Sequence, residues 1–192
     1  VSDVETPVGA FQKIGREGSS FLFESAERNE ESGRFSFIGI DPLLLVSQRN
    51  GELTIREKNG KVSKHSTSDP LADLQRILAE FHLVPRHEIP HFQGGVVGFV
   101  GYDVIRFFEP KATIHSRDDL KLPEMMFMIA SALIVFDHRF RTMRVIAFAD
   151  TRKGKADDGY HAACKQIEII LDRLAAPSRL QPIAADSRSG RL

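Results

Sequence analysis

The chain has 192 residues, of which 42% are hydrophobic and 27% are charged, as in ordinary globular proteins. Lysine plus arginine equals aspartate plus glutamate at 26 each, so the chain lacks the basic excess of most nucleic-acid-binding domains. We recognise no signal peptide and no apolar run long enough to span a bilayer, and the single cysteine, Cys164, excludes an internal disulfide. These features predict a cytoplasmic protein that binds neither nucleic acid nor membrane.

The first 66 residues are expected to form one helix and then strands. Thr6-Pro7 predicts a helix start, because threonine caps the first turn and proline fits it, and Gly15 can end the helix. Apolar residues alternate with other residues from Phe21 onward, as in strands. Asn50-Gly51 and Asn59-Gly60 are pairs that suit type I′ turns and therefore predict a hairpin meander. Its three antiparallel strands are expected at 43–49, 52–58 and 61–66.

The second part of the chain alternates helices and strands. Asp69-Pro70 predicts a helix start, and residues 94–108 resemble a glycine-spaced strand and its continuation. Two long apolar strands are expected at 125–136 and 142–149. A last helix is expected from a cap near Asp157-Asp158 to a stop at Pro177, with an apolar stripe made by Tyr160, Ala163, Cys164, Ile167, Leu171 and Leu174. This order predicts an α+β fold with antiparallel, sandwich-like β-sheets and flanking helices.

Catalytic groups are not evident from residue chemistry alone. The glycines of GGVVGFVGYD do not follow a phosphate-loop spacing, and the histidines lack the partners of a zinc set, so we predict no metal site. Cys164 lies on an apolar stripe and is expected to be a buried, inert thiol. The charged side chains after the glycine-rich strand could form a site or a surface ion-pair network, and these are Asp103, Arg106 and Glu109.

The segment Leu22-Phe23-Glu24-Ser25 places a carboxylate and a hydroxyl inside an apolar strand. An unpaired buried polar group costs about 1–3 kcal/mol, so such groups need water or a specific partner. One interpretation is a ligand that carries an amine and a ring N–H. The other is structural, with Ser25 ending the strand and Glu24 meeting water or an arginine such as Arg34. Residue chemistry alone favours the structural interpretation slightly.

Three blocks of sequence, taken together, resemble anthranilate synthase component I, the large chorismate-using subunit. The first is DVETPVGAF from Asp3 to Phe11, and the second is SFLFES from Ser20 to Ser25 with GRFSFIG and Asp41-Pro42 after it. The third is GGVVGFVGYDVIRFFE from Gly94 to Glu109. The blocks occur in the family's order over about the first 110 residues.

The resemblance implies an N-terminal regulatory domain over residues 1–176 and a linker or disordered tail over 177–192. It implies that Leu22, Phe23, Glu24 and Ser25 bind the inhibitor L-tryptophan, with Phe23 standing where the family usually has leucine. The chorismate-binding domain, with its Mg²⁺ carboxylates, is expected in a further part that this chain lacks. A fragment of this kind is expected to be inactive alone and to hold no cofactor. In the whole enzyme, ammonia from a glutamine amidotransferase subunit would convert chorismate to anthranilate and pyruvate.

Two alternatives remain open from the sequence. The large subunit of aminodeoxychorismate synthase belongs to the same superfamily and can share this fold and a tryptophan pocket. A stand-alone module that binds a ligand or a protein, without enzymatic activity, is the other.

Overall fold

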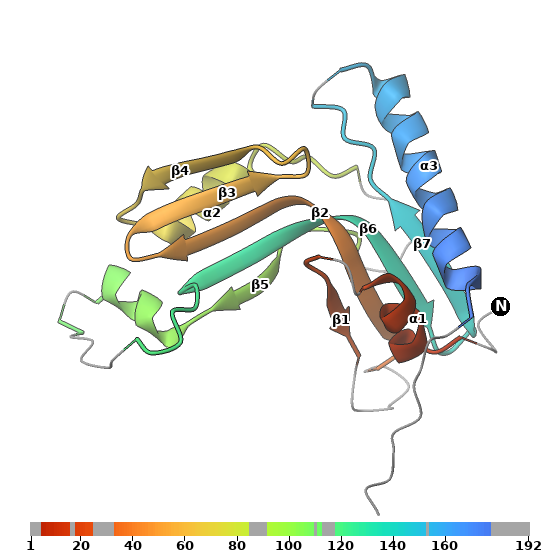
Figure 1. Cartoon of the computed structure of the whole chain (residues 1–192), viewed down its shortest axis with the longest axis horizontal. Coiled ribbons are helices and arrows are strands. Elements are labelled where there is room, and N and C mark those ends of the chain that lie inside the picture. Colours follow the sequence, from red (N-terminus) through yellow and green to blue (C-terminus); the bar gives the residue numbers. More distant parts are fainter. Residues whose placement is uncertain are drawn as a thin grey trace, which may run out of the picture.

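The computed structural model describes residues 5–15, 18–24, 33–84, 92–109, 111–112, 118–152 and 154–177. Within these ranges the chain forms one curled antiparallel sheet with helices on its flanks, which confirms the predicted α+β class (Figure 1). The helical elements are α1 (Pro7–Ile14), α2 (Pro70–Leu78), the 3₁₀ helix η1 (Tyr102–Phe107) and α3 (Ala156–Ala175). The strands are β1 (Phe21–Phe23), β2 (Phe35–Arg49), β3 (Glu52–Glu57), β4 (Val62–Ser66), β5 (Val97–Val100), β6 (Met125–Asp137) and β7 (Thr142–Ala147).

The two longest strands, β2 and β6, form the centre of the sheet. They pair antiparallel along nearly their whole length, from Phe35 opposite Asp137 to Gln48 opposite Met125. The main path is β4-β3-β2-β6-β5, while β1 pairs with the first part of β2 and β7 with the last part of β6. Each shorter strand is therefore placed by its pairing with β2 or β6, directly or through β3.

A β-bulge lies in the middle of β2, where the register shifts between Pro42 and Leu44. Asp41, just before it, has φ of 49°, a left-handed conformation uncommon for residues other than glycine. On the side away from β6, β1 pairs with residues 37–39 and β3 with residues 44–49. This gap explains why proline is tolerated in a central strand, since ladder hydrogen bonds on that side are interrupted there.

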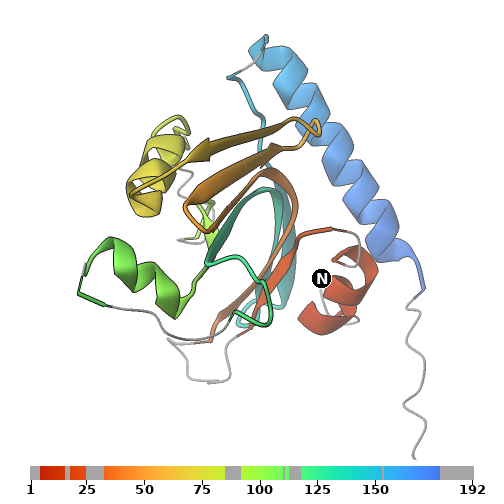
Figure 2. The same cartoon turned by 60° about the vertical axis from the view of Figure 1, so that its left-hand side comes forward.

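The helices cover different parts of the sheet. Figure 2 shows α1 and α3 together on one flank and α2 and η1 on the other. The first flank encloses a core that includes Ala10, Ile38, Ile134 and Ile170. The second encloses a separate core that includes Val46, Leu53, Leu74, Val104 and Met125.

The predicted helix starts at Thr6-Pro7 and Asp69-Pro70 are confirmed. The Thr6 hydroxyl accepts a hydrogen bond from the Gly9 amide at 3.0 Å, and the Asp69 carboxylate accepts one from the Ala72 amide at 3.0 Å. Both prolines occupy the first helical turn, where the missing N–H costs nothing. Local chemistry alone was sufficient to place these two boundaries.

The predicted meander of β2, β3 and β4 is confirmed, but one of its turns is of a different type. Asn50 and Gly51 have φ of 50° and 77°, as a type I′ turn requires. At the second turn, Gly60 has φ of 87° whereas Asn59 does not adopt a positive φ. The Gly60 amide donates to the Glu57 carbonyl and the Glu57 amide to the Lys61 carbonyl, which is the pattern of a three-residue loop ending in a glycine bulge.

The predicted glycine-rich strand 94–108 is shorter than expected. Only Val97–Val100 is strand, and the continuation is the 3₁₀ helix η1. A side chain at Gly98 would place its Cβ 1.9 Å from the Met126 carbonyl oxygen of β6. Glycine is therefore required there by close backbone approach.

The last helix, α3, has the predicted extent but a different buried face. Its buried residues are Ala163, Ile170 and Leu174, whereas Tyr160 and Leu171 are 63% and 48% exposed. The cap was also predicted wrongly, since Lys155 holds the N-cap position and Asp157 and Asp158 lie inside the first turn. Carboxylates in this turn still interact favourably with the helix dipole.

We predict that Gly39→Ala destabilises the sheet by about 1–3 kcal/mol, because an added Cβ would lie 2.1 Å from the Phe21 ring. Gly39 pairs with Phe21, so the substitution acts on the β1–β2 contact. Denaturant unfolding measures the change. When Phe21 is also replaced by alanine, the destabilisation caused by Gly39→Ala should fall to less than half. An equal penalty in both backgrounds would contradict this origin.

Candidate functional site

The sequence-predicted tryptophan segment lies on β1 at the margin of the sheet. Leu22 and Phe23 are in the strand, opposite Ile38 and Phe37 of β2, and Glu24 follows directly with its side chain exposed. Ser25 lies outside the described residues, so its contacts stay a prediction. The three described residues of the segment lie next to one another at the end of a short strand.

The two faces of β1 have different surroundings. Leu22 packs against the core between α1, α3 and the sheet, and this contact anchors the strand. Phe21 packs on the other side, against a third cluster that contains Phe35, Phe37 and Phe92. Because alternate residues of a strand face opposite sides, Phe23 lies on the same side as Phe21.

Five phenylalanines on this side form what we call the aromatic patch: Phe21, Phe23, Phe35, Phe37 and Phe92. The rings of Phe21 and Phe23 are 4.9 Å apart between centroids, and those of Phe37 and Phe92 are 5.2 Å apart at nearly right angles. Phe23 is 50% exposed, so a large part of its ring surface is open to solvent. Sequence reasoning identified Phe23 but missed Phe92, which arrives from a segment about 70 residues further along the chain.

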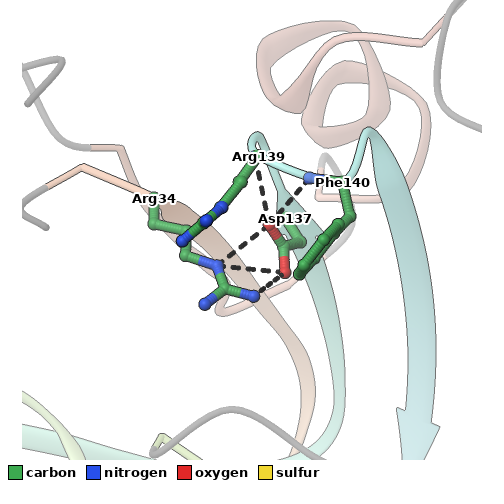
Figure 3. A network of polar contacts seen from close by, with 4 residues as sticks. All are labelled: Arg34, Asp137, Arg139 and Phe140. Atoms are coloured by element: carbon green, nitrogen blue, oxygen red, sulfur yellow. Dashed lines mark hydrogen bonds and ion pairs between the residues drawn. The ribbon is translucent and has the colours of Figure 1, made fainter. Parts of the chain in front are cut away.

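An ion pair lies at the start of β2, near the aromatic patch (Figure 3). Arg34 donates to both carboxylate oxygens of Asp137, with its closest contact at 2.7 Å. Its guanidinium also lies 4.6 Å from the centroid of the Phe35 ring and 5.0 Å from that of Phe140. Arg34 therefore binds Asp137 of β6, so the pairing of Arg34 with Glu24 is not supported, whereas the exposed Glu24 agrees with the alternative in which this side chain meets water.

The Asp137 carboxylate is buried and well supplied with donors. Burial by itself would raise its pKa, but the hydrogen bond from Arg34 and the backbone N–H groups of Phe140 and Arg139 outweigh burial. The net result is a pKa below the ordinary value for aspartate. The same contact raises the pKa of Arg34. The pair thus stays charged at neutral pH and fastens the end of β6 to the start of β2.

The predicted charged group after the glycine-rich strand forms structural contacts. Arg106 of η1 makes an ion pair with Glu124, the residue before β6. Burial would raise the pKa of Glu124, but the hydrogen bonds from Arg106 and from the Asn50 amide hold it below the ordinary value. These contacts attach η1 to the sheet, so the ion-pair interpretation holds for Arg106, with Glu124 as a partner outside the predicted group.

The other sequence candidates have these surroundings. Cys164 is only partly buried, against the expectation of a buried thiol. Within the described part of the chain no three histidine, cysteine, aspartate or glutamate side chains could together hold a metal ion. The described helices include none that is long and apolar enough to cross a membrane.

A separate cavity of about 690 Å³ lies beyond the aromatic patch, and its lining includes Gly94, Ala130 and Phe148. Among its polar groups, Arg152 binds Asp150 through two contacts of 2.7 and 2.8 Å and covers the Phe81 ring at 3.7 Å. These charged groups therefore satisfy each other. The cavity belongs to the same sheet face as the aromatic patch, since Ala130 and Phe148 are in the third core cluster.

We predict that Asp137→Asn destabilises the protein by about 1–2 kcal/mol at pH 7, since it removes a charge-assisted contact with a partly exposed arginine. The folded-state pKa of Asp137 is lowered, so its stabilising contribution is present above the unfolded pKa of about 3.9 and is lost as the pH falls through the folded pKa. Urea unfolding from pH 7 to pH 3 should show the two proteins converging only below about pH 4. Glu168→Gln, on the exposed side of α3, is the control. If the difference in unfolding free energy between the two proteins is the same at pH 3 as at pH 7, the ion pair does not have this role.

Comparison with known proteins gives a consistent family assignment. No family model matches the chain. Anthranilate synthase component 1 of Acinetobacter calcoaceticus is 30% identical over 185 residues, which cover 94% of this chain and 37% of the relative. The component 1 proteins of Synechocystis sp. and Bacillus caldotenax are 33% and 32% identical, and they match 92% and 100% of this chain but 35% and 38% of their own length.

A solved structure gives the same result. The crystal structure of anthranilate synthase component I from Streptococcus pneumoniae TIGR4 matches with a TM-score of 0.61 and 28% sequence identity, over 92% of this chain and 36% of that one. Sequence and fold therefore agree along nearly the whole of this chain, which spans a little over a third of the length of these relatives. The chain belongs to the anthranilate synthase component I family.

Proposed function

We propose that residues 1–176 are the N-terminal regulatory domain of an anthranilate synthase component I and that residues 177–192 lead into the rest of the polypeptide. The family membership supports this proposal, as does the match to about a third of each relative's length. Most of the chain up to Pro177 takes part in one sheet and its flanking helices, as expected of a domain. A clone that extends beyond residue 192 would test the boundary, and a natural stop codon there would refute it.

The family also supports a proposal for the activity of the whole protein. The proposed reaction is the amination of chorismate with loss of pyruvate, which yields anthranilate for tryptophan biosynthesis. Ammonia would come from a glutamine amidotransferase subunit, and the Mg²⁺ carboxylates would belong to the chorismate-binding part. The 192-residue chain should therefore show no conversion of chorismate by itself.

The regulatory role is proposed to be tryptophan sensing at the end of β1. The observation that carries it is the exposed Glu24 carboxylate, which follows the half-exposed Phe23 ring of the aromatic patch. Glu24 lies just past the end of β1, so strand pairing does not fix its side chain on the face opposite Phe23. An indole ring is suited to edge-to-face or offset packing on such rings. A carboxylate is suited to an ammonium group or an indole N–H. Ser25, next in the chain, is proposed to add a direct contact.

The chain contains no tryptophan, so the fluorescence of added L-tryptophan can be followed with little background. Binding should shift its emission to shorter wavelength as the indole leaves water. We expect Glu24→Gln to weaken binding about 10-fold or more, the loss of one charge-assisted hydrogen bond. Glu168→Gln, another exposed glutamate on α3, should leave it unchanged. Equal affinities for the two variants would remove Glu24 from the site.

Inhibition of the whole enzyme provides a test that includes the rest of the pocket. In the full-length polypeptide, Ser25→Ala and Glu24→Gln should raise the tryptophan concentration needed for half-inhibition, while the rate without tryptophan stays within about two-fold. The reason is that an allosteric ligand acts through its own site and its coupling to the active site. Unchanged inhibition in both variants would refute the proposed site even if the enzymatic assignment holds.

A further inference from the structure

The two outer strands of the main sheet path, β4 and β5, each have one edge that pairs with no other described strand, and they differ in how this free edge is protected. All five residues of β4 are exposed, and Lys64 within it binds Glu52 at 2.7 Å. Lys61 lies just before this strand. In β5, three of four residues are exposed, yet no charged residue occurs from Gly94 to Tyr102. Only β4 therefore carries the charges that commonly prevent edge-to-edge pairing.

Apolar side chains surround the unprotected edge. Phe99 and Val100 of β5 are 47% and 46% exposed, and Tyr102 and Phe108, at the two ends of η1, are 84% and 54% exposed. In Figure 1, β5 lies on the outer side of β6 and leads directly into η1, so these four residues belong to adjoining elements at one edge of the sheet. Phe99 and Val100 are neighbours in a strand and face opposite sides of the sheet, so apolar groups are exposed on both sides of this edge. Such a concentration of exposed apolar side chains is typical of a docking surface.

The segment that leads into β6 adds to the same edge. The Gly101 amide donates to the Glu124 carbonyl at 2.7 Å, which places this segment beside the start of η1. Leu120 and Leu122 in it are 79% and 59% exposed. We call the β5 edge together with these six apolar residues the β5 corner: Phe99, Val100, Tyr102, Phe108, Leu120 and Leu122.

We propose that the β5 corner is the docking surface for the remainder of the polypeptide, which adds a strand to the free edge of β5. Relatives are nearly three times as long as this chain, so a large part of each family member lies outside it. A strand from the same polypeptide acts at an effective concentration in the millimolar range, which favours it over a second copy. Main-chain hydrogen bonds would give such a strand its affinity and the apolar side chains its register. The inference rests on the proposal that this chain is the first part of a longer protein.

Val100 and Val62 provide a matched pair of substitutions, because both are 46% exposed and they lie on opposite edge strands. In the full-length polypeptide, Val100→Lys should lower the melting temperature by about 3 °C or more, since it places a charge in the buried contact. Val62→Lys should change it by less than about 1 °C. In the 192-residue chain both substitutions should be nearly neutral.

Hydrogen exchange tests the added strand without any substitution. Amides of residues 97–100 that point away from β6 should exchange quickly in the 192-residue chain and be slowed at least 10-fold in the full-length polypeptide. Amides of β4 should exchange alike in both proteins. Equal exchange in β5, or full tolerance of Val100→Lys, would overturn the docking proposal.

The outcomes separate this proposal from the proposed function. A gene that ends at residue 192 would refute both. If the full-length enzyme makes anthranilate but shows neither the lower melting temperature of Val100→Lys nor the slowed exchange in β5, the proposed function stands and the docking surface is refuted. Self-association of the full-length polypeptide that Val100→Lys abolishes would assign the β5 corner to a second copy and also refute it.

Discussion

The antiparallel pairing of β2 with β6 is the interaction on which the rest of the structure depends. These strands run side by side from Phe35 opposite Asp137 to Gln48 opposite Met125, and each other strand pairs with one of them or, as β4 does, through β3. The Arg34–Asp137 ion pair fastens one end of this ladder, and the contacts of Glu124 fasten the other. Because strand register has a period of two, a slip of one residue would turn both helix-covered cores outward.

The bulge between Pro42 and Leu44 divides this long pairing into two halves that support different strands. Before it, β2 supports β1, and after it, β2 supports the β3–β4 meander. A polar cluster stabilises the division: Gln166 of α3 donates to Ser131 of β6 at 2.7 Å and to Asp41 at 3.3 Å. The proposed tryptophan site belongs to the first half, and the β5 corner belongs to the second. The two regions are joined by the pairing of β2 with β6, and also by Phe92, which precedes β5 and contacts Phe21 and Phe37.

The two proposed surfaces have a common physical character. In each, apolar side chains are exposed on a part of the sheet that the described helices leave uncovered, as Phe23 and Phe99 illustrate. The two cores under the helices are closed by comparison and hold the most deeply buried residues, such as Ile38 and Leu53. A ligand pocket completed by another part of the same protein would make regulation depend on how that part sits. This arrangement suits an allosteric domain.

Local chemistry in the sequence was sufficient for some of the element boundaries. Capping at Thr6-Pro7 and Asp69-Pro70 and the turn at Asn50-Gly51 involve neighbouring residues only, so they can be read without knowledge of the fold. The fold class and the family resemblance followed from the order of these elements and from the quoted motifs. Tertiary structure decided what depends on distant partners. The second Asn-Gly turn adopted a bulged loop, and α3 buried Ile170 instead of Leu171.

The same distinction applies to the candidate site. The sequence by itself determined that Leu22, Phe23 and Glu24 would lie together, because they are neighbours in a strand. Only the tertiary structure showed that Phe92 contacts this strand and that Arg34 pairs with Asp137 rather than with Glu24. Both contacts join segments that are about 70 to 100 residues apart in the chain. Short-range propensity contains no information about such pairs, which are selected by the packing of the whole sheet.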